Sequence, residues 1–285
     1  MAFEILAGLL SNSLALLTDA AHNFTDVIAL GLSWYALRLT AQPANHRKTY
    51  GYHRAGILVA LANSTTLVII SFGIFYEAYQ RLLSPPEVVP GILIVVGSVA
   101  FLINLITAWL VKRGSEHDLN LRSAFVHLMG DVLSTVGAVV AGILIALTGA
   151  NWLDPLVSVL IGLLILWNAW GILRETVDIL LEGTPRDLDV SAMLIDLQDV
   201  EGVLGVHDLH VWSISQALRT LSAHIVTDVT SISAGAMIQE QISHMLDQKY
   251  GIVHATLQLE CQDCLPGDLY CSMTTGANHS QRLNH

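Results

Sequence analysis

Residues 13–39 read SLALLTDAAHNFTDVIALGLSWYALRL. This stretch exceeds the roughly 20 mostly apolar residues that a helix needs to cross a bilayer. It nevertheless holds Asp19, His22 and Asp26. An ionisable side chain inside a bilayer costs about 2.5–3.5 kcal/mol on insertion scales, so its presence indicates a functional site. The stretch therefore predicts a membrane helix that carries a polar site.

The rest of the composition agrees with a membrane protein. The chain has 285 residues, of which 53% are hydrophobic and 13% charged, and its formal net charge is −11. Soluble domains carry about 25% charged residues, so this composition excludes intrinsic disorder and argues against a simple soluble enzyme. The acidic balance argues against nucleic acid as a partner. Four more stretches can span a bilayer: residues 55–79, 89–111, 123–147 and 153–173.

The first helix and the orientation follow from the flanking residues. Residues 2–10 are apolar but too short to span, so we expect the chain to begin inside its first membrane helix. Most basic residues of this half lie in the loops after the first and before the fourth long stretch: Arg38, Arg47, Lys48, Arg54, Lys112, Arg113 and Arg122. Cytoplasmic loops are enriched in Lys and Arg, so we expect these loops and the C-terminal half to be cytoplasmic.

The pattern His-x-x-x-Asp occurs in two of the predicted membrane helices, as His22 with Asp26 and as His127 with Asp131. Residues four apart share a helix face. Two such helices facing each other offer two nitrogens and two oxygens, which suits tetrahedral Zn²⁺. Mg²⁺ and Ca²⁺ prefer more oxygen ligands, and Cu⁺ prefers sulfur. One buried His–Asp pair is more often a structural hydrogen bond, but its repetition in two membrane helices favours a metal site.

Asp19 and proton binding extend this interpretation. Asp19 lies on the same face as His22 and Asp26, where it is a further ligand, a partner that orients His22, or a polar residue near the outer helix end. We favour the last two roles. All four predicted ligands can bind protons, so metal and protons compete for the site. A site that faces alternate sides of the membrane turns this competition into exchange.

A family resemblance rests on several stretches: Ser13-Leu14-Ala15-Leu16, Asp19-Ala20-Ala21-His22, Tyr50-Gly51-Tyr52, Leu180-Leu181-Glu182-Gly183 and His207-Asp208-Leu209-His210-Val211-Trp212. With them the chain resembles the cation diffusion facilitators, in particular the bacterial Czc-type zinc and cadmium exporters. The resemblance implies a homodimer in the bacterial inner membrane that exports Zn²⁺, or Cd²⁺ and Co²⁺, against H⁺. It places the transport site on His22, Asp26, His127 and Asp131. A second site at His46 and His53 stays open, and a solvated basic loop is favoured there.

We therefore expect a polytopic α-helical membrane protein, a six-helix bundle whose first helix is incomplete, with a cytoplasmic α+β ferredoxin-like domain. The predicted bounds are 1–178 for the transmembrane metal-transport domain, 179–186 for a linker, 187–264 for the cytoplasmic domain and 265–285 for a disordered tail. In the cytoplasmic domain, periodicity predicts helices at 190–198 and 231–249 and strands at 203–214, 218–226 and 252–260. This order suits a small sheet with helices on one face.

A second candidate centre lies in the cytoplasmic half. His207, His224 and Glu260 come from three different predicted strands, as a site built across a sheet requires. Cys261 and Cys264 follow as a Cys-x-x-Cys pair that can bind zinc as thiolates; a redox pair and idle cytosolic thiols are the alternatives. By resemblance this domain dimerises and binds metal, and cytosolic zinc bound there can act as a regulator.

Three functions remain to be weighed. A proton-coupled exporter uses both centres. A membrane-tethered metal sensor uses the cytoplasmic centre but leaves the membrane centre without a purpose. An intramembrane zinc enzyme needs an open coordination position and a nearby general base, whereas four protein ligands close the site. We therefore expect a transporter rather than an enzyme.

Overall fold

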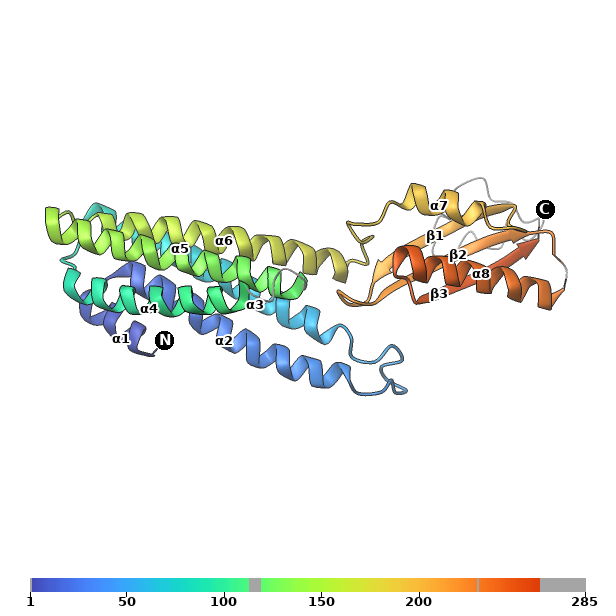
Figure 1. Cartoon of the computed structure of the whole chain (residues 1–285), viewed down its shortest axis with the longest axis horizontal. Coiled ribbons are helices and arrows are strands. Elements are labelled where there is room, and N and C mark those ends of the chain that lie inside the picture. The colour runs from blue at the N-terminus through green and yellow to red at the C-terminus, as the bar shows by residue number, and fades with distance from the viewer. Residues whose placement is uncertain (1, 113–118, 230, 262–285) are drawn as a thin grey trace, which may run out of the picture. The chain divides into compact units, whose positions relative to one another are not determined.

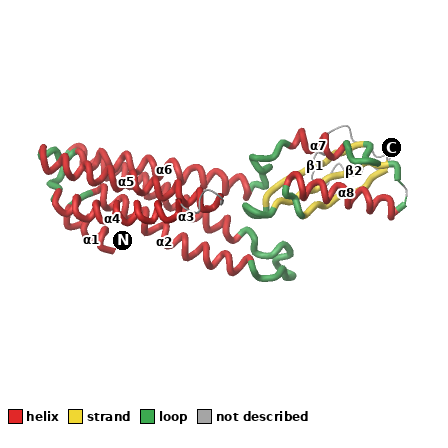
Figure 2. Tube along the Cα trace, viewed as in Figure 1, coloured by secondary structure: helices red, strands yellow, loops and turns green. Residues whose placement is uncertain are grey.

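The computed structural model describes residues 2–112, 119–229 and 231–261. The chain divides into two compact units, one made of residues 1–43 and 58–176 and the other of residues 44–57 and those from 177 onward. The long helices build the first unit, and all described strands belong to the second (Figure 1, Figure 2). The two kinds of centre predicted above therefore lie in different units.

The first unit is built from helices α1 to α6. Their bounds are Ala2–Ser11, Leu14–Thr40, Ala55–Leu83, Pro90–Lys112, Leu119–Thr148 and Leu153–Leu180. All five predicted long helices are present, and α1 is the short helix that was expected. Among the described residues, α3, α4, α6 and residues 124–148 of α5 are long and apolar enough to cross a membrane. Helix α2 has the length but is the least apolar of the five, because it carries the charged residues of the site.

Four of these helices contact one another in a closed ring. Helix α1 packs on α2, α2 on α5, α5 on α4, and α4 on α1. The pair α4 and α5 approaches closely at Gly142, where a Cβ atom would lie 3.0 Å from side-chain atoms of Leu93 and Ile94. Small residues allow such close packing between membrane helices. The ring places α2 and α5, the carriers of the two His-x-x-x-Asp motifs, side by side.

The N-terminus of α2 is held by two side chains. Ser13 is the N-cap and accepts a hydrogen bond from the Leu16 backbone N–H. Asp154, at the start of α6, is fully buried. Its carboxylate accepts hydrogen bonds from Ser13 Oγ at 2.5 Å and from the backbone N–H groups of Leu14 and Ala15 at 2.6 and 3.3 Å. A carboxylate there satisfies free donors and complements the positive end of the helix dipole.

The second unit contains a three-stranded sheet and two helices. Its elements are α7 (Val190–Gln198), β1 (Gly205–Ser213), β2 (Arg219–Thr227), α8 (Ile232–Tyr250) and β3 (His254–Cys261). The strand order is β1-β2-β3, with β1 antiparallel and β3 parallel to β2. The predicted order of helices and strands is therefore confirmed.

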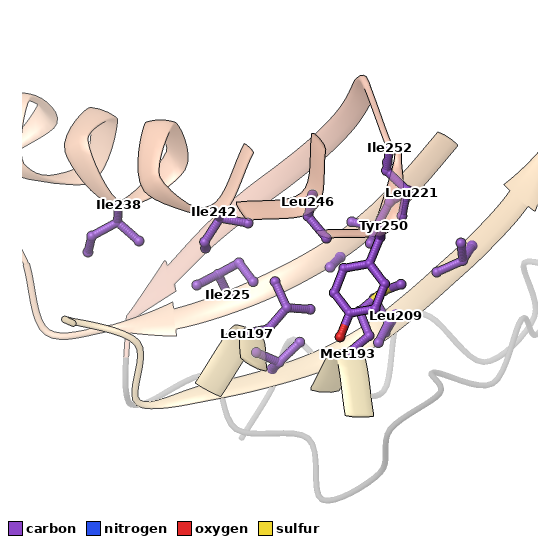
Figure 3. Packing of buried hydrophobic residues seen from close by; sticks show 13 residues of the cluster. Met193, Leu197, Leu209, Leu221, Ile225, Ile238, Ile242, Leu246, Tyr250 and Ile252 are labelled. Carbon is purple, nitrogen blue, oxygen red and sulfur yellow. The ribbon is translucent and has the colours of Figure 1, made fainter. Parts of the chain in front are cut away.

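One face of this sheet forms the core of the second unit. Ile238, Ile242 and Leu246 of α8 point toward the strands, where Ile225 of β2 meets them (Figure 3). Met193 and Leu197 of α7 and the ring of Tyr250 belong to the same cluster (Figure 3). Both helices therefore cover the same face. Because side chains alternate along a strand, the neighbours of these core residues lie on the opposite face of the sheet.

Candidate metal centres

The first candidate centre is a ladder of side chains between α2 and α5. Along α2 the chain runs from Asp19 through His22 to Asp26, and along α5 it runs in the opposite direction from His127 through Asp131 to Ser134. Three pairs face each other, and we call them the α2–α5 ladder. His127 Nε2 lies 3.2 Å from Asp26 Oδ2, His22 Nε2 lies 3.4 Å from Asp131 Oδ1, and Ser134 Oγ lies 2.7 Å from Asp19 Oδ1.

The contacts between imidazoles and carboxylates in the first two pairs are close to the distances between ligand atoms on a tetrahedral metal ion. Besides the contacts above, His22 Nε2 lies 3.4 Å from Asp26 Oδ2 and His127 Nε2 lies 3.8 Å from Asp131 Oδ2. Ligand atoms on a tetrahedral Zn²⁺ with bonds of 2.0–2.1 Å are about 3.3 Å apart. His22, His127 and Asp131 each offer one ligand atom within 4.8 Å of the others, and the fourth predicted ligand, Asp26, lies beside this cluster and contacts both imidazoles. Two neutral imidazoles and two carboxylates would carry the charge that balances a divalent cation.

Exposure decreases in steps along the ladder. The side chains of His127 and Asp26 are 46% and 29% exposed. Those of His22 and Asp131 are 12% and 10% exposed. The third pair, Asp19 and Ser134, is buried. The open end of the ladder is therefore the end nearer the loop that follows α2.

The ring of His22 has one unusual nitrogen. Its Nε2 faces the two carboxylates, while its Nδ1 is buried and has no hydrogen-bond partner among the described residues. Metal-binding imidazoles usually donate from the second nitrogen to a carboxylate, carbonyl or water. Asp19 does not fill this role, because its carboxylate accepts from Ser134 Oγ at 2.7 Å and from Asn23 Nδ2 at 3.3 Å. Asp19 is thus bound to the opposite helix rather than to the neighbouring imidazole.

The sequence interpretation missed Ser134. The signal was available in the spacing: Ser134 follows Asp131 by three residues, as Asp19 precedes His22 by three. Two antiparallel helices with these spacings place the two residues opposite each other.

The second candidate centre lies on the face of the sheet opposite α7 and α8. His207 and His224 are direct partners across β1 and β2, with ring centroids 4.9 Å apart, and Glu260 lies near the end of β3. Glu260 contacts both rings: Oε2 lies 2.9 Å from His207 Nε2, and Oε1 lies 2.9 Å from His224 Nδ1. One ligand atom from each of the three residues lies within 4.8 Å of the others. This donor set fits Zn²⁺, which takes imidazole and carboxylate ligands.

An irregularity in β1 adds a carboxylate beside this centre. The register with β2 shifts between His207 and His210, and Asp208 has a left-handed φ of 51°. Its carboxylate lies 3.7 Å from His224 Nε2 and 3.2 Å from His210 Nε2. The bulge inserts a residue into the strand and re-aims its side chains. The sequence analysis missed this arrangement, although the alternation of apolar residues is interrupted between Val206 and Leu209.

The remaining predicted site residues have separate outcomes. Among the described residues, two clusters have metal-binding geometry, and His46 and His53 belong to neither. The ring of Tyr50, in the same loop, instead contacts that of His254 edge-on, with centroids 5.8 Å apart. The side chain of Cys261 and all of Cys264 lie outside the described part of the chain.

The fold and the two centres define a class of protein. It is a helical membrane protein with clustered His and Asp side chains between two helices, followed by a small sheet domain with a second cluster. The cation efflux transmembrane domain model matches residues 1–181, and the model of the cation efflux protein cytoplasmic domain matches residues 185–262. The chain belongs to the cation efflux family.

Individual relatives extend this match over the whole chain. The cadmium, cobalt and zinc/H⁺-K⁺ antiporter of Bacillus subtilis is 40% identical over 265 residues, which cover 92% of this chain and 85% of that protein. Zinc transporter ZitB of Escherichia coli is 35% identical over 288 residues, which cover 100% of this chain and 90% of that protein. The solved C-terminal domain of the CzcD transporter from Cupriavidus metallidurans is 29% identical, with a TM-score of 0.24, over 26% of this chain and 99% of that one.

Proposed function

We propose that this chain exports divalent metal ions, with Zn²⁺ as the main substrate, across the bacterial inner membrane in exchange for protons. One observation carries the proposal: two imidazoles and two carboxylates, all able to bind protons, contact one another at 3.2–3.8 Å between two helices of the membrane unit. The names of the bacterial relatives above, which describe zinc, cadmium and cobalt transport, support it.

The ligand set supports proton exchange as well as metal binding. Imidazole binds and loses protons near neutral pH, and metal binding requires deprotonated ligands. Each ion that enters the site therefore releases protons, and protons that enter from the opposite side expel the ion. His22, Asp26, His127 and Asp131 perform both halves of this exchange in the proposed mechanism.

The exposure gradient supports cytoplasmic access in the conformation described. The exposed pair of the ladder lies nearest the loop after α2, whose basic residues favour the cytoplasmic side. The opposite end is closed by buried side chains, and the N-terminus of α2 is bonded to Asp154. A metal ion from the cytoplasm would reach Asp26 and His127 first and His22 and Asp131 next.

We propose a regulatory role for the cytoplasmic domain. Residues 187–264 pair two copies of the chain and bind metal through His207, His224 and Glu260, with Cys261 and Cys264 as further candidates. The match to the cation efflux cytoplasmic domain model supports this assignment. Residues 1–178 move the metal, and 179–186 connect the two parts.

The test of transport uses purified protein in sealed vesicles that hold a zinc dye, with an imposed pH gradient. We expect zinc movement that requires the gradient and disappears in Asp26→Ala and in Asp131→Ala. Glu87→Ala is the matched control, because it removes an exposed carboxylate outside the ladder. Zinc movement that persists in both ladder variants would show that the site is elsewhere. Correctly inserted protein that moves no zinc, cadmium or cobalt would contradict the proposal.

A further inference from the structure

The third pair of the α2–α5 ladder differs from the other two in what it can do during transport. The first two pairs consist of predicted ligands, whose contacts with each other are replaced by bonds to the metal when an ion binds. The third pair, Asp19 and Ser134, contains no predicted ligand in contact with the ion and can remain bonded throughout. It is the one pair of the ladder that can hold α2 against α5 while the other two rearrange.

Burial makes this pair costly to break. Asp19 is 3% exposed and Ser134 is 7% exposed. Both carboxylate oxygens of Asp19 accept hydrogen bonds, Oδ1 from Ser134 and Oδ2 from Asn23. A buried polar group that loses its partner costs more than the bond itself contributes. The native register of the two helices is therefore favoured over any shifted register that separates Asp19 from Ser134.

The register of α2 and α5 determines the distances between ligand atoms. His22 and Asp26 move with α2, while His127 and Asp131 move with α5. Ser134 lies one turn beyond Asp131, and Asp19 lies one turn before His22. If α2 slides along α5 at the third pair, the distance between His22 and Asp131 therefore changes as well. Zn²⁺ requires short, near-tetrahedral bonds. A loosened register would therefore reduce discrimination against ions that accept longer bonds.

We propose that Asp19 and Ser134 are positioning residues that fix the register of α2 against α5 and thereby set the metal preference of the transport site. The proposal rests on the proposed transport function. Neither side chain binds the ion; both act through the ligands one turn away. The sequence left metal ligation and orientation of His22 open as roles for Asp19. The positioning role proposed here replaces both.

The test compares four variants in the vesicle assay, each with Zn²⁺ and with Cd²⁺. Ser134→Ala and Asp19→Ala each remove the bond between the helices. We expect the Zn²⁺ concentration for half-maximal transport to rise about tenfold in both, the change expected from losing one buried hydrogen bond. The preference for Zn²⁺ over Cd²⁺ should decrease in parallel. Asp19→Asn should retain most of the wild-type behaviour, because its amide oxygen still accepts from Ser134 and Asn23 can turn its own amide.

Thr135→Val is the matched control. Thr135 is buried and adjacent to Ser134, and both hydroxyls contact the Asp131 backbone oxygen. Among the described residues, the Thr135 hydroxyl has hydrogen bonds to backbone oxygens of α5 alone, those of Asp131 and Val132. Thr135→Val removes a buried hydroxyl and leaves the hydrogen bond between Asp19 and Ser134 in place. We expect unchanged metal preference in this variant, so a general effect of disturbing α5 is separated from an effect of register.

Two outcomes would overturn the proposal. Equal loss in Asp19→Asn and Asp19→Ala, with wild-type transport in Ser134→Ala, would show that the carboxylate itself serves as a ligand or proton carrier. Unchanged half-maximal concentration and preference in Ser134→Ala and Asp19→Ala would show that the bond has no role. A second measurement is zinc binding to the protein in detergent, counted as the binding that Asp26→Ala abolishes. It tests the same register even if the wild-type protein transports no zinc. Failure of wild-type transport alone would contradict the proposed function.

Discussion

At the scale of single residues, the first two pairs of the ladder combine two imidazoles with two carboxylates. Imidazole nitrogen suits zinc, copper, iron and nickel, whereas carboxylate oxygen also suits manganese, magnesium and calcium. The two nitrogens, His22 Nε2 and His127 Nε2, face the carboxylates of Asp26 and Asp131 at 3.2–3.8 Å. Replacing one nitrogen with oxygen should therefore shift the preference of the site toward harder ions.

His22→Asp tests this shift. The variant keeps a ligand at the same position on α2 but supplies a third carboxylate oxygen. We expect transport of Zn²⁺ to decrease about tenfold relative to transport of Mn²⁺, a change equal to about 1.4 kcal/mol in relative transition-state stability. The measurement is initial transport rate for each ion in vesicles. His244→Asp, at an exposed position on α8, is the control; an unchanged ratio in His22→Asp would argue that this position does not contact the ion.

Tyr250 gives a pH-dependent prediction outside the membrane unit. Its ring is buried in the core (Figure 3), and its hydroxyl donates a hydrogen bond to Asp196 of α7. Burial, and then this bond, raise the pKa of Tyr250 from 10.0 to about 12. The folded domain therefore holds the phenolic proton more tightly than the unfolded chain does. Its contribution to stability is complete below pH 10 and is lost as pH rises to about 12.

The measurement is the urea midpoint of unfolding as a function of pH, compared between the wild type and Tyr250→Phe. The difference between the two curves should be constant below pH 10 and should shrink as pH approaches about 12, because only the wild type has this phenol to ionise. A difference that stays constant over this range would show that the phenol titrates equally in the folded and unfolded states.

Residue spacing explains which parts of the ladder could be predicted. The i, i+4 rule is local, so each His–Asp pair could be placed on one helix face from the sequence alone. The facing of α2 and α5 is a tertiary contact that spacing only suggests. Ser134 was missed because a lone serine in a membrane helix usually bonds to its own backbone, as Ser64 and Ser71 do. Ser134 Oγ also lies 2.9 Å from the Asp131 carbonyl of its own helix, in addition to its contact with Asp19.

At the scale of elements, α2 depends on a residue from another helix. Asp154 lies in the first turn of its own helix, α6, and its carboxylate also binds the N-terminus of α2. Helix starts can be recognised from local residues, whereas a cap supplied from more than a hundred residues away cannot. Helix α2 carries His22 and Asp26, so this cap also supports the site.

Asp154→Ala should destabilise the membrane unit. It leaves Ser13 Oγ and two backbone N–H groups without their acceptor in a buried place, which we expect to cost about 2–4 kcal/mol. The thermal midpoint in detergent should decrease accordingly. Asp154→Asn should lose less, because its amide oxygen can still accept from one of these donors. Equal midpoints for the wild type and Asp154→Ala would show that water replaces the carboxylate at no cost.

The cytoplasmic elements show the same division between local and long-range information. Periodicity predicted the strands that carry His207, His224 and Glu260. In the sheet, His207 pairs directly with His224, and Glu260 pairs with Val226, two residues further along β2. The bulge at Asp208 was missed although the alternation breaks there: two polar residues, His207 and Asp208, separate Val206 from Leu209. Only the pairing with β2 shows that this break is an extra residue in β1.

At the scale of the whole molecule, the chain does not divide at a single point. Residues 44–57, which follow α2 in sequence, belong to the unit of the cytoplasmic domain, where Arg54 pairs with Glu182 at 3.3 Å and Tyr50 meets His254. The linker predicted at 179–186 indicated where the soluble half begins. It carried no information on this loop, because contacts between distant segments leave no periodic signal.

The cytoplasmic centre gives the last prediction, at the scale of both units together. We expect the triple variant His207→Ala, His224→Ala and Glu260→Ala to lose the thermal stabilisation that zinc gives to the wild-type chain, because binding to the folded state alone raises stability. We also expect the variant to need more cytoplasmic zinc for half-maximal transport, with little change in the maximal rate. Its transport ligands are intact, so only the response to zinc should change.

His244→Ala separates this effect from the loss of any histidine. His244 is exposed on α8 and lies outside the cluster, so its removal should leave both the stabilisation and the zinc response at wild-type values. Loss of stabilisation in the triple variant with an unchanged zinc response of transport would show that the centre binds metal without regulating transport. Retained stabilisation would show that zinc binds elsewhere. Because the two readouts report on different units, their agreement would establish that metal bound in one unit changes transport through the other.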